Sequence, residues 1–367
     1  MVEWKELGDF LNFEQPTPYL VKSTEYDNSY KTPVLTAGQS LLLGYTNETD
    51  GIYEADKDNP CIIFDDFTTS FHWIDFPFKV KSSAMKMLKP KKNTFFRYVY
   101  YAMQQIQFVP QQHQRHWISK YSHFTIPIPS LDEQKRIVGI LDTFTDSIEN
   151  LKQQIAQRRK QFEFYRDQLL DLEGKEGVEM KLQDIAQYRR GSFPQPYGNR
   201  EWYDGEGAMP FVQVADVEES GMRLKKKTKQ FISQLAMPKS VFVPKGTVIV
   251  TLQGSIGKVA INQYDVYVDR TLAIFEKFII EMNKKYFAYQ LERIFSIKKE
   301  KARGGTIKTI TKEEFSAFVI PVPPLPEQSR IVSILDTFEA SISNLEAQLS
   351  QRQKQYEYYR NKLLTFE

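Results

Sequence analysis

Residues 126–170 read IPIPSLDEQKRIVGILDTFTDSIENLKQQIAQRRKQFEFYRDQLL, and residues 320–364 read IPVPPLPEQSRIVSILDTFEASISNLEAQLSQRQKQYEYYRNKLL. The two stretches align without a gap at an offset of 194, and 28 of their 45 paired positions are identical. Such self-similarity indicates a duplicated structural unit. The segments before each copy, 1–125 and 181–319, match only in places. The repeat therefore predicts two diverged heads on two near-identical stems.

The duplicated stretch has the apolar periodicity of a coiled-coil helix. In the first copy, apolar residues step by four and three from Ile137 to Leu169 with one vacancy at Arg158, and the second copy repeats this seam from Ile331 to Leu363. A heptad seam sustained for more than four repeats predicts one long helix in each copy. We expect each helix to span about 38 residues, roughly 57 Å at 1.5 Å per residue.

Sequence signals also indicate where these helices begin. Pro127 and Pro129 bar a helix upstream of the first copy, and the segment 130–133, SLDE, has the form of a capping box. In the second copy, Pro326 can occupy the first helical turn. Because so narrow an apolar stripe does not stabilise a lone helix, we expect the two helices to pair with each other in antiparallel orientation.

Arg158 and Arg352 occupy the same seam position in the two copies, where apolar residues would pack better. A polar seam residue can fix the register of a coiled coil; alternatively, the guanidinium leaves the seam for solvent. The aromatic residues of the stems exceed what one seam needs, and form either a docking face for a partner subunit or a second layer of an internal core. The candidate docking and spacer residues are Phe144, Arg158, Phe162, Phe164, Tyr165, Phe338, Arg352, Tyr356, Tyr358 and Tyr359.

The composition is typical of a large globular protein of a reducing compartment. With 367 residues, 41% of them apolar, the chain can bury two domain-sized cores. The single cysteine, Cys61, excludes an internal disulfide, and the opening MVEWKELGDF lacks the basic and apolar regions of a signal peptide. No apolar run approaches the roughly eighteen residues of a membrane span. We therefore expect a cytoplasmic protein that contacts no membrane.

The heads combine short strands with helices. In head two, the apolar runs 248–252 and 273–275 indicate strands and residues 283–300 indicate a helix, which makes the fold class α/β, of the mixed α+β kind. We predict two globular heads joined by two long antiparallel helices, with pseudo-twofold symmetry from the internal duplication. The expected segments are 1–128 for head one, 129–172 for stem one, 173–180 for a linker, 181–322 for head two and 323–367 for stem two.

Head one repeats part of the plan of head two. The segment from Val80 to Ile106 aligns with that from Val268 to Ile294, and each reads as a strand leading into an aromatic-rich helix. Residues 117–120, WISK, align with residues 309–312, TITK, and the opening VEWK at 2–5 aligns with VEMK at 178–181. We therefore expect the heads to be diverged duplicates of one domain.

Neither head carries a recognisable catalytic motif. The segment from Gly254 to Lys258 has the wrong spacing for a Walker loop, and no glycine fingerprint for a dinucleotide or a methyl donor is present. His113 and His116 are three residues apart, but no cysteine or acidic cluster accompanies them, so we expect no metal site. No pairing of a nucleophile with a base is evident. We expect a non-catalytic chain that binds no cofactor.

Basic residues concentrate in head two. The segment 173–322 has 24 basic against 18 acidic residues, whereas 1–128 has 13 against 14. A local excess of this kind suits nucleic acid, although it also occurs on ordinary solvated surfaces. Glycine lets backbone N–H groups approach phosphates, and arginine or glutamine can bond base edges through two hydrogen bonds. The candidate DNA-binding residues are Arg189, Arg190, Gln213, Lys225, Lys226, Lys227, Gln253, Lys258, Arg270, Arg303 and Lys308 in head two, and Lys89, Lys91, Lys92, Arg115, His116 and Lys120 in head one.

Two sets of motifs resemble a known family. The pattern L-x-E-Q-x-R-I-V-x-I-L-D follows a proline-rich strand end at Leu131 and at Leu325, and the segment from Pro244 to Arg270 contains GSIGKVA at 254–260. These motifs, with GGTIK at 304–308, resemble the conserved helical regions and target recognition domains of the specificity (S) subunit of Type I restriction-modification enzymes. The resemblance covers the whole chain. Head one departs from it because a clear GSIGKVA segment is missing there.

The resemblance implies that each head reads one half of a bipartite, asymmetric target in double-stranded DNA, and that the paired helices set the spacing and bind two modification subunits. It also implies a prokaryotic complex in which the modification subunits bind S-adenosylmethionine and methylate adenine, while restriction subunits use ATP and Mg²⁺. Heads on helices of this length could address half-sites a little over one helical turn, about 34–36 Å, apart.

Two alternatives remain open from the sequence. A non-DNA adaptor would use the coiled coil as its functional element and bind proteins through its heads, which the near-neutral charge of head one permits. A specificity subunit of a Type IIB-like system would work with a combined nuclease and methylase. The adaptor predicts binding that is insensitive to salt, whereas a DNA-binding subunit loses affinity steeply with salt because it releases counterions.

Overall fold

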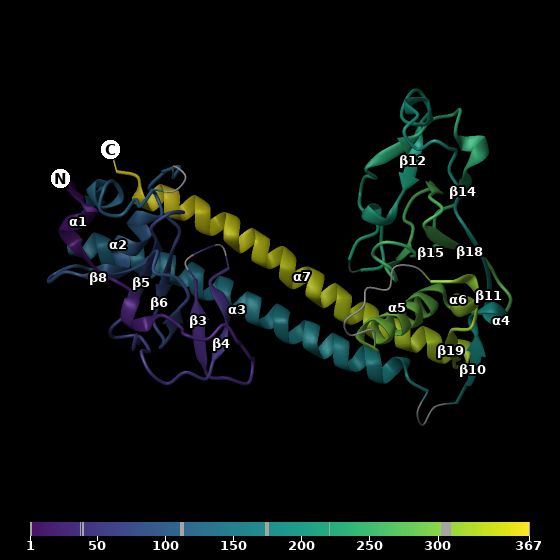
Figure 1. Ribbon diagram of the computed structural model, residues 1–367, viewed down its shortest axis with the longest axis horizontal. Coiled ribbons are helices and arrows are strands. Elements are labelled where there is room, and N and C mark those ends of the chain that lie inside the picture. Colours follow the sequence, from purple (N-terminus) through teal and green to yellow (C-terminus); the bar gives the residue numbers. More distant parts are fainter. Residues whose placement is uncertain are drawn as a thin grey trace. The chain divides into compact units, whose positions relative to one another are not determined.

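The computed structural model describes residues 2–36, 38, 40–110, 114–172, 176–219, 221–301 and 310–366. The chain forms two compact units: unit 1 comprises Met1–Lys152 and Gln348–Glu367, and unit 2 comprises Gln153–Ala347. Each unit contains one head and a part of each long helix. Both ends of the chain belong to unit 1 (Figure 1).

Unit 2 contains two four-stranded sheets and a two-stranded one. The first has the strand order β11-β18-β15-β16 and is antiparallel throughout, with β11 at Ala186–Arg190, β18 at Leu272–Phe278, β15 at Val248–Thr251 and β16 at Val259–Ile261. The second has the order β13-β12-β17-β14, with β13 at Gln230–Ile232, β12 at Met209–Val212, β17 at Val266–Val268 and β14 at Val241–Val243. The third pairs β10 (Val178–Lys181) with β19 (Val319–Val322).

Unit 1 repeats this topology. The order β2-β8-β5-β6 matches the first sheet of unit 2, with β2 at Leu11–Glu14, β8 at Met85–Pro90, β5 at Cys61–Asp65 and β6 at Phe71–Ile74. The order β4-β3-β7 matches most of the second, with β4 at Leu42–Thr46, β3 at Thr32–Leu35 and β7 at Lys79–Val80. Both second sheets contain one parallel pair, β3 with β7 and β12 with β17. The shared topology supports the duplication of the heads.

Strand pairing corrects one alignment that the sequence predicted. In unit 1, β1 (Glu3–Glu6) pairs with β9 (Thr125–Ile128), and Glu3 lies opposite Ile128. In unit 2, Val178 lies opposite Val322, which is the repeat partner of Ile128. Glu3 is therefore the counterpart of Val178, so matching VEWK with VEMK letter by letter is wrong by one residue. The position of a strand in its sheet, rather than four similar letters, decides the equivalence.

The shorter helices of the two units also correspond. Helix α1 (Leu7–Phe10) follows β1 as α4 (Leu182–Ile185) follows β10, and α2 (Phe96–Met103) follows β8 as α5 (Lys284–Lys301) follows β18. Helix α6 (Lys312–Ser316) precedes β19, and Thr311 caps it by a reciprocal capping box with Glu314. Short 3₁₀ turns complete the described elements, at Thr17–Tyr19, Tyr121–His123, Arg200–Trp202, Val214–Asp216 and Met237–Lys239.

The two predicted stems form the helices α3 (Leu131–Leu170) and α7 (Leu325–Leu364), each of 40 residues. At the start of α3, the hydroxyl of Ser130 accepts a hydrogen bond of 3.4 Å from the backbone N–H of Glu133. The carboxylate of Glu133 binds the guanidinium of Arg136, so only half of the predicted capping box forms. Pro326 lies in the first turn of α7, as predicted.

The long helices pair in antiparallel orientation, as the seam predicted (Figure 1). In unit 1 the ring of Phe144 stacks on that of Tyr359, and in unit 2 the ring of Phe162 packs near that of Phe338. As residue numbers increase along α3, the numbers of the contacting residues on α7 therefore decrease. An ion pair of 2.6 Å between Arg159 and Glu346 follows the same antiparallel order.

The C-terminal end of each long helix completes the core of a head. Leu170, at the end of α3, is fully buried in the main core of head two, and Leu364, at the end of α7, is 3% exposed in the core of head one. The side-chain amide of Gln290 donates a hydrogen bond of 2.8 Å to the carbonyl of Leu170. Each head therefore needs both long helices for a closed core.

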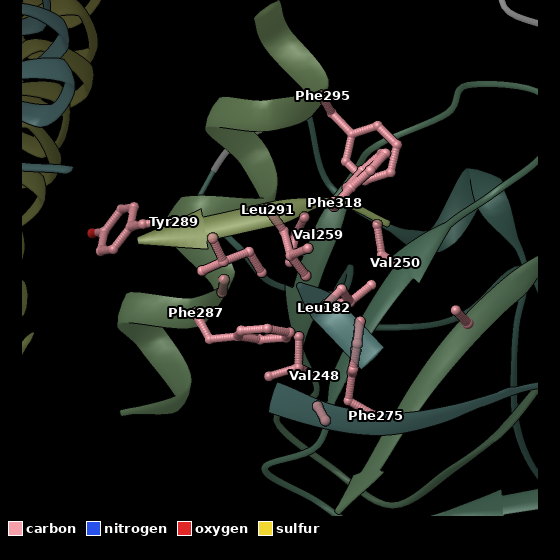
Figure 2. Close-up of a cluster of buried hydrophobic side chains, with 14 of the residues drawn as sticks. Leu182, Val248, Val250, Val259, Phe275, Phe287, Tyr289, Leu291, Phe295 and Phe318 are labelled. Carbon is pink, nitrogen blue, oxygen red and sulfur yellow. The ribbon is translucent and has the colours of Figure 1, made fainter. Parts of the chain in front are cut away.

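Helix α5 uses two of its faces in this core (Figure 2). Phe287 and Leu291 point toward the strands of the first sheet, where Val248 and Phe275 lie (Figure 2). Tyr289 points away from the other labelled side chains, toward the long helices. Its hydroxyl donates a hydrogen bond of 2.8 Å to the carboxylate of Glu339 on α7. One helix thus attaches the sheet of head two to the stem.

Similar hydrogen bonds attach each head to the long helices in the two units. In unit 1, the hydroxyls of Tyr98 and Tyr101 donate to the carbonyl of Pro127 at 2.7 Å and to the carboxylate of Asp142 at 2.5 Å, and Arg97 donates to the same carboxylate at 2.7 Å. These are charge-assisted or buried hydrogen bonds, which hold geometry firmly. They fix α2 against the start of α3.

In unit 2, Tyr286 and Lys285 of α5 take the places of Tyr98 and Arg97. The hydroxyl of Tyr286 donates to the carbonyl of Pro321 at 3.0 Å, and burial raises the pKa of this phenol to about 12. Lys285 donates to Asp336 at 2.5 Å and to Glu339 at 2.9 Å. Burial lowers the pKa of Lys285, but the two carboxylates outweigh it, so this pKa lies above its usual value.

Replacing Leu364 with alanine tests whether α7 completes the core of head one. Because Leu364 is buried, Leu364→Ala should lower the local free energy of unfolding by about 2–5 kcal/mol. Amide hydrogen exchange should accelerate throughout unit 1 and stay unchanged in unit 2. The exposed Lys362 on the same turn supplies the control Lys362→Ala, which should leave both units unchanged. Equal exchange in both variants would mean that the end of α7 is not part of this core.

Candidate nucleic-acid interface

Strand ends of head two meet at residues 268–272, which comprise the loop between β17 and β18 and one strand residue on each side. Three backbone hydrogen bonds join this loop to the ends of β11, β12 and β15: Ser192 N to Val268 O at 3.1 Å, Asp269 N to Val212 O at 3.0 Å, and Leu252 N to Thr271 O at 2.9 Å. These bonds gather around one loop the backbones of four predicted DNA-binding residues, Arg190, Gln213, Gln253 and Arg270. Residues far apart in the sequence thus share one surface region.

Glycine is required where β11 meets this loop. A Cβ atom on Gly191 would lie 2.1 Å from the carbonyl oxygen of Val268 and 2.5 Å from that of Asp269, so any other residue would collide with backbone. Gly191 lies among the basic residues for which the sequence analysis expected glycine to let backbone N–H groups approach phosphates. Its observed role is the close packing of two strand ends.

The basic residues of head two differ in how available they are. Lys225, Lys226 and Lys227 are all exposed, as is Arg270. Arg189 forms a long ion pair of 3.8 Å with Glu276. Gln213 acts as a helix cap: its side chain and that of Asp216 form a reciprocal capping box at the 3₁₀ turn that follows β12.

Lys258 is less available than the exposed lysines of head two. Its side chain is 12% exposed, and its ammonium forms an ion pair with Glu219. In the same GSIGK segment, Gly257 has a φ of +78°, and a Cβ atom there would lie 2.4 Å from the ring of Phe295. The segment therefore packs against α5, and Lys258 has a partner within head two. Arg303 and Lys308 lie outside the described residues.

Head one has the same meeting of strand ends at the loop that follows β7. Val21 N donates to Val80 O at 2.9 Å, and Lys81 N donates to Leu35 O at 3.0 Å, which repeats two of the three bonds in head two. Lys81 is exposed, and its ammonium lies 5.8 Å from the ring centroid of Tyr26. The sequence analysis missed Lys81, which directly follows Val80, the counterpart of Val268; head two has Asp269 at the position equivalent to Lys81.

The residues predicted in head one lie elsewhere. Strand β8 begins at Met85, just after the strand-end loop. Its other end contains Lys89, and the strand is followed by Lys91 and Lys92. Lys89 pairs with Glu14 at 3.0 Å. Lys92 is exposed, as are Arg115 and Lys120. The strand-end loop and the predicted patch are thus different parts of head one.

One predicted contact in head one, His116, is corrected by its burial, and a second, Lys91, has a partner inside the head. His116 is 0% exposed, and its backbone N–H donates to the carbonyl of Asp66, so the side chain belongs to the interior. The ammonium of Lys91 donates a hydrogen bond of 2.5 Å to the carbonyl of Gly8 in α1. Both residues stabilise head one itself.

The arginines of the seam stack on aromatic rings of the opposite helix. The guanidinium of Arg352 lies 5.6 Å from the ring centroid of Phe144, whose ring stacks on Tyr359 at 5.3 Å. The arrangement recurs at the repeat positions: Arg158 lies 5.8 Å from Phe338, whose ring stacks on Tyr165 at 5.5 Å. Cation–π contacts of this kind are worth roughly 0.5–2 kcal/mol. The arginine stays in the seam as a ring partner, which is compatible with the register role and differs from the alternative in which the guanidinium leaves for solvent.

Each stem also carries an exposed aromatic pair. Phe164 is 64% exposed and Tyr165 is 43% exposed, with their rings edge to face at 5.3 Å. At the repeat positions, Tyr358 is 60% exposed and Tyr359 is 41% exposed, also edge to face at 5.3 Å. Large exposed apolar groups that recur in the same geometry are typical of interaction surfaces. The remaining candidates, Phe162 and Tyr356, are half-buried.

The long helices also line a cleft in each unit, and this cleft is duplicated as well. The cleft of unit 2 has a volume of about 450 Å³ and that of unit 1 about 780 Å³. Eight lining positions on the long helices are common to the two clefts and are related by the offset of 194. Four of them keep their chemistry in both copies: Ile148 and Ile342, Glu357 and Glu163, Arg360 and Arg166, and the aromatic Tyr356 and Phe162.

The described ranges offer neither a metal centre nor a membrane segment. No three or more His, Cys, Asp or Glu side chains are arranged there to hold a metal ion. None of the helices described is long and apolar enough to cross a membrane. His113, which the sequence analysis weighed as a metal ligand, lies outside the described residues.

Comparison with known proteins identifies the family. Residues 1–158 and 175–354 match the Type I restriction modification DNA specificity domain, so two copies of this domain cover most of the chain. The chain belongs to this family. Its specificity subunits do not catalyse, so this chain is a non-catalytic DNA specificity subunit of a Type I restriction-modification system. The resemblance that the sequence motifs indicated is confirmed, and the adaptor alternative is removed.

Relatives match this specificity subunit over its full length. It is 39% identical to the Type I restriction enzyme EcoR124I/EcoR124II specificity subunit of Escherichia coli, over 100% of this chain and 94% of the relative. It is 27% identical to a putative Type I restriction enzyme specificity subunit of Haemophilus influenzae, over 100% of this chain and 96% of the relative. The crystal structure of the S subunit from M. genitalium shares the fold, with a TM-score of 0.61, 15% identity, and coverage of 100% of this chain and 97% of the other.

Reversing the charge of three exposed lysines tests the DNA-facing role of head two. Replacing Lys225, Lys226 and Lys227 with glutamate should weaken DNA binding nearly equally for all sequences, because surface lysines contact phosphates through charge. The slope of log affinity against log salt should fall by about one for each phosphate that the variant no longer neutralises. Lys181→Glu, at an exposed position of β10, is the control. Weakening confined to one base pair would mean that these lysines read bases instead.

Proposed function

We propose that each head of this specificity subunit reads one half of a bipartite, asymmetric target in double-stranded DNA, and that α3 and α7 set the spacing between the halves. The observation that carries the proposal is the repeated meeting of strand ends, at 268–272 in head two and after Val80 in head one. The two loops share a backbone framework and carry different side chains. Two heads with a similar backbone framework but different side chains are suited to recognising two different DNA sequences.

The partners follow from the duplicated stem surfaces. Two copies of one modification subunit would meet the same chemistry at both stems: an exposed aromatic pair, and a cleft that keeps an isoleucine, a glutamate and an arginine. Aromatic side chains and arginine are enriched at the centres of protein interfaces. Restriction subunits would be further partners of this chain in the full complex. S-adenosylmethionine would bind the modification subunits, and ATP and Mg²⁺ the restriction subunits, so that adenine methylation and cleavage take place outside this chain.

The methylome of cells that express this chain with its modification subunit tests the reading of two half-sites. A new adenine mark within a split, asymmetric motif is expected, and cells without this chain should lack the mark. Exchanging head two, at the proposed boundaries 181–322, for that of another such subunit should change one half-site and leave the other intact. Change in both halves would refute independent heads. No mark from an active, bound modification subunit would refute the function itself, and methylation coupled to a fused nuclease would indicate a Type IIB-like partner set.

Removing one aromatic pair at a time tests the docking surfaces. Replacing Phe164 and Tyr165 with serine should reduce the number of bound modification subunits from two to one, and replacing Tyr358 and Tyr359 should do the same. The quadruple variant should bind none, because removing an anchor from an interface centre typically costs at least about 2 kcal/mol of binding free energy. Native mass spectrometry of the assembled complex gives the stoichiometry. Two bound subunits in the quadruple variant would exclude these surfaces.

A further inference from the structure

We propose that Arg270 reads a guanine in the major groove for head two, and that Tyr197 and Asp269 hold its guanidinium in the reading position. The inference rests on the proposed function, since it assigns one base contact within the half-site of head two. It concerns a single side chain at the loop where the strand ends meet.

Arg270 is placed where a reading residue must be. It lies in the loop between β17 and β18, is exposed, and follows the almost fully buried Asp269. Its guanidinium carbon lies 5.2 Å from the ring centroid of Tyr197. Stacking on a ring occupies one face of the planar guanidinium and leaves the N–H groups at its edge directed outward.

The tyrosine below Arg270 is itself firmly held. The hydroxyl of Tyr197 donates a hydrogen bond of 2.5 Å to Oδ2 of Asp269, and its ring stacks on that of Phe193 at 5.1 Å. The hydroxyl of Tyr203 donates to the carbonyl of Tyr197 at 2.9 Å. Burial, followed by the bond to Asp269, raises the pKa of Tyr197, so the phenol keeps its proton near neutral pH. Because these three contacts hold Tyr197 in place, its ring restricts the motion of the Arg270 guanidinium that packs on it.

Asp269 is committed to this scaffold. Its Oδ1 accepts hydrogen bonds from the backbone N–H of Thr271 at 2.9 Å and from the Thr271 hydroxyl at 2.6 Å, while Oδ2 accepts from Tyr197. In the described part of head two, Arg270 has no carboxylate partner. Arg189, Arg223 and Arg293, by contrast, form ion pairs with Glu276, Glu218 and Asp171. The guanidinium of Arg270 is thus oriented but not neutralised.

An oriented arginine with exposed edge donors fits guanine. Guanine presents two acceptors, O6 and N7, in the major groove, and the guanidinium fork bonds both, which is the commonest specific contact between protein and DNA. In head one the cation at the corresponding loop is Lys81, which also lies against a tyrosine ring. An ammonium is a point charge without the planar fork. The guanine-reading role is therefore assigned to head two alone.

The test uses the complete complex with its modification subunits and the motif that the methylome defines. Affinity is measured for the cognate duplex and for duplexes with each base pair of the head-two half-site replaced in turn, at several salt concentrations. Arg270→Ala should weaken cognate binding roughly 5- to 150-fold and abolish discrimination at one G·C pair, with the other half-site unaffected. Arg270→Lys should behave like alanine at that pair, because it keeps the charge but loses the fork.

Two further variants sharpen the result. Tyr197→Phe keeps the ring but removes the bond to Asp269, so it should lower discrimination at the same base pair without changing the salt slope. Arg223→Ala removes an exposed arginine that is paired with Glu218 and should leave affinity and discrimination unchanged. Since Arg270 is exposed, its replacement should not unfold head two, and hydrogen exchange checks this.

Each other outcome is decisive. Weakening that is uniform over all duplexes, with rescue by Arg270→Lys and a salt slope lower by about one, would assign Arg270 to a phosphate and overturn the inference. Wild-type behaviour of Arg270→Ala would overturn it as well. If the wild-type complex showed no preference for a split motif, the proposed function would fail first, whatever Arg270 does.

Discussion

The structure depends on the burial of the far end of each long helix. Helix α3 begins beside head one and ends with Leu170 in the core of head two, while α7 begins beside head two and ends with Leu364 in the core of head one. Burying a leucine side chain contributes about 1.5–3 kcal/mol. Neither core closes without a helix that begins at the other head. The antiparallel pairing of α3 and α7 is therefore required by the heads as much as by the seam between the helices.

The stems were the part of the fold that sequence could predict. A seam that repeats every seven residues predicts a long helix, and the capping signals are local. The start of α3 and the first-turn position of Pro326 therefore followed from the sequence. The tyrosine attachments of the heads did not. Tyr101 meets Asp142 and Tyr289 meets Glu339 across 41 and 50 residues of sequence, and no periodicity marks such pairs.

The candidate interface was only partly predictable for the same reason. Exposed lysines can be named from a basic run, but whether a basic residue is available depends on partners that are distant in sequence. Lys258 pairs with Glu219 and Lys91 bonds the carbonyl of Gly8, 83 residues away, so both have a structural role that no local pattern reveals. His116 is buried by tertiary packing. Lys81 was missed because the search in head one followed basic runs rather than the position equivalent to the end of β17.

Because of its internal duplication, one chain can offer two similar surfaces to a partner and two different surfaces to DNA. A partner that binds twice needs two equal surfaces, and the stem clefts keep an isoleucine, a glutamate, an arginine and an aromatic ring at repeat positions. A target with two different halves needs two unequal readers, and the strand-end loops differ: one places an arginine on Tyr197, the other a lysine on Tyr26. Two of the three backbone bonds that shape the loop of head two nevertheless recur in head one. Since these recurring bonds join backbone atoms, we expect that base preference at one head can change without disturbing the helices or the partner that they bind.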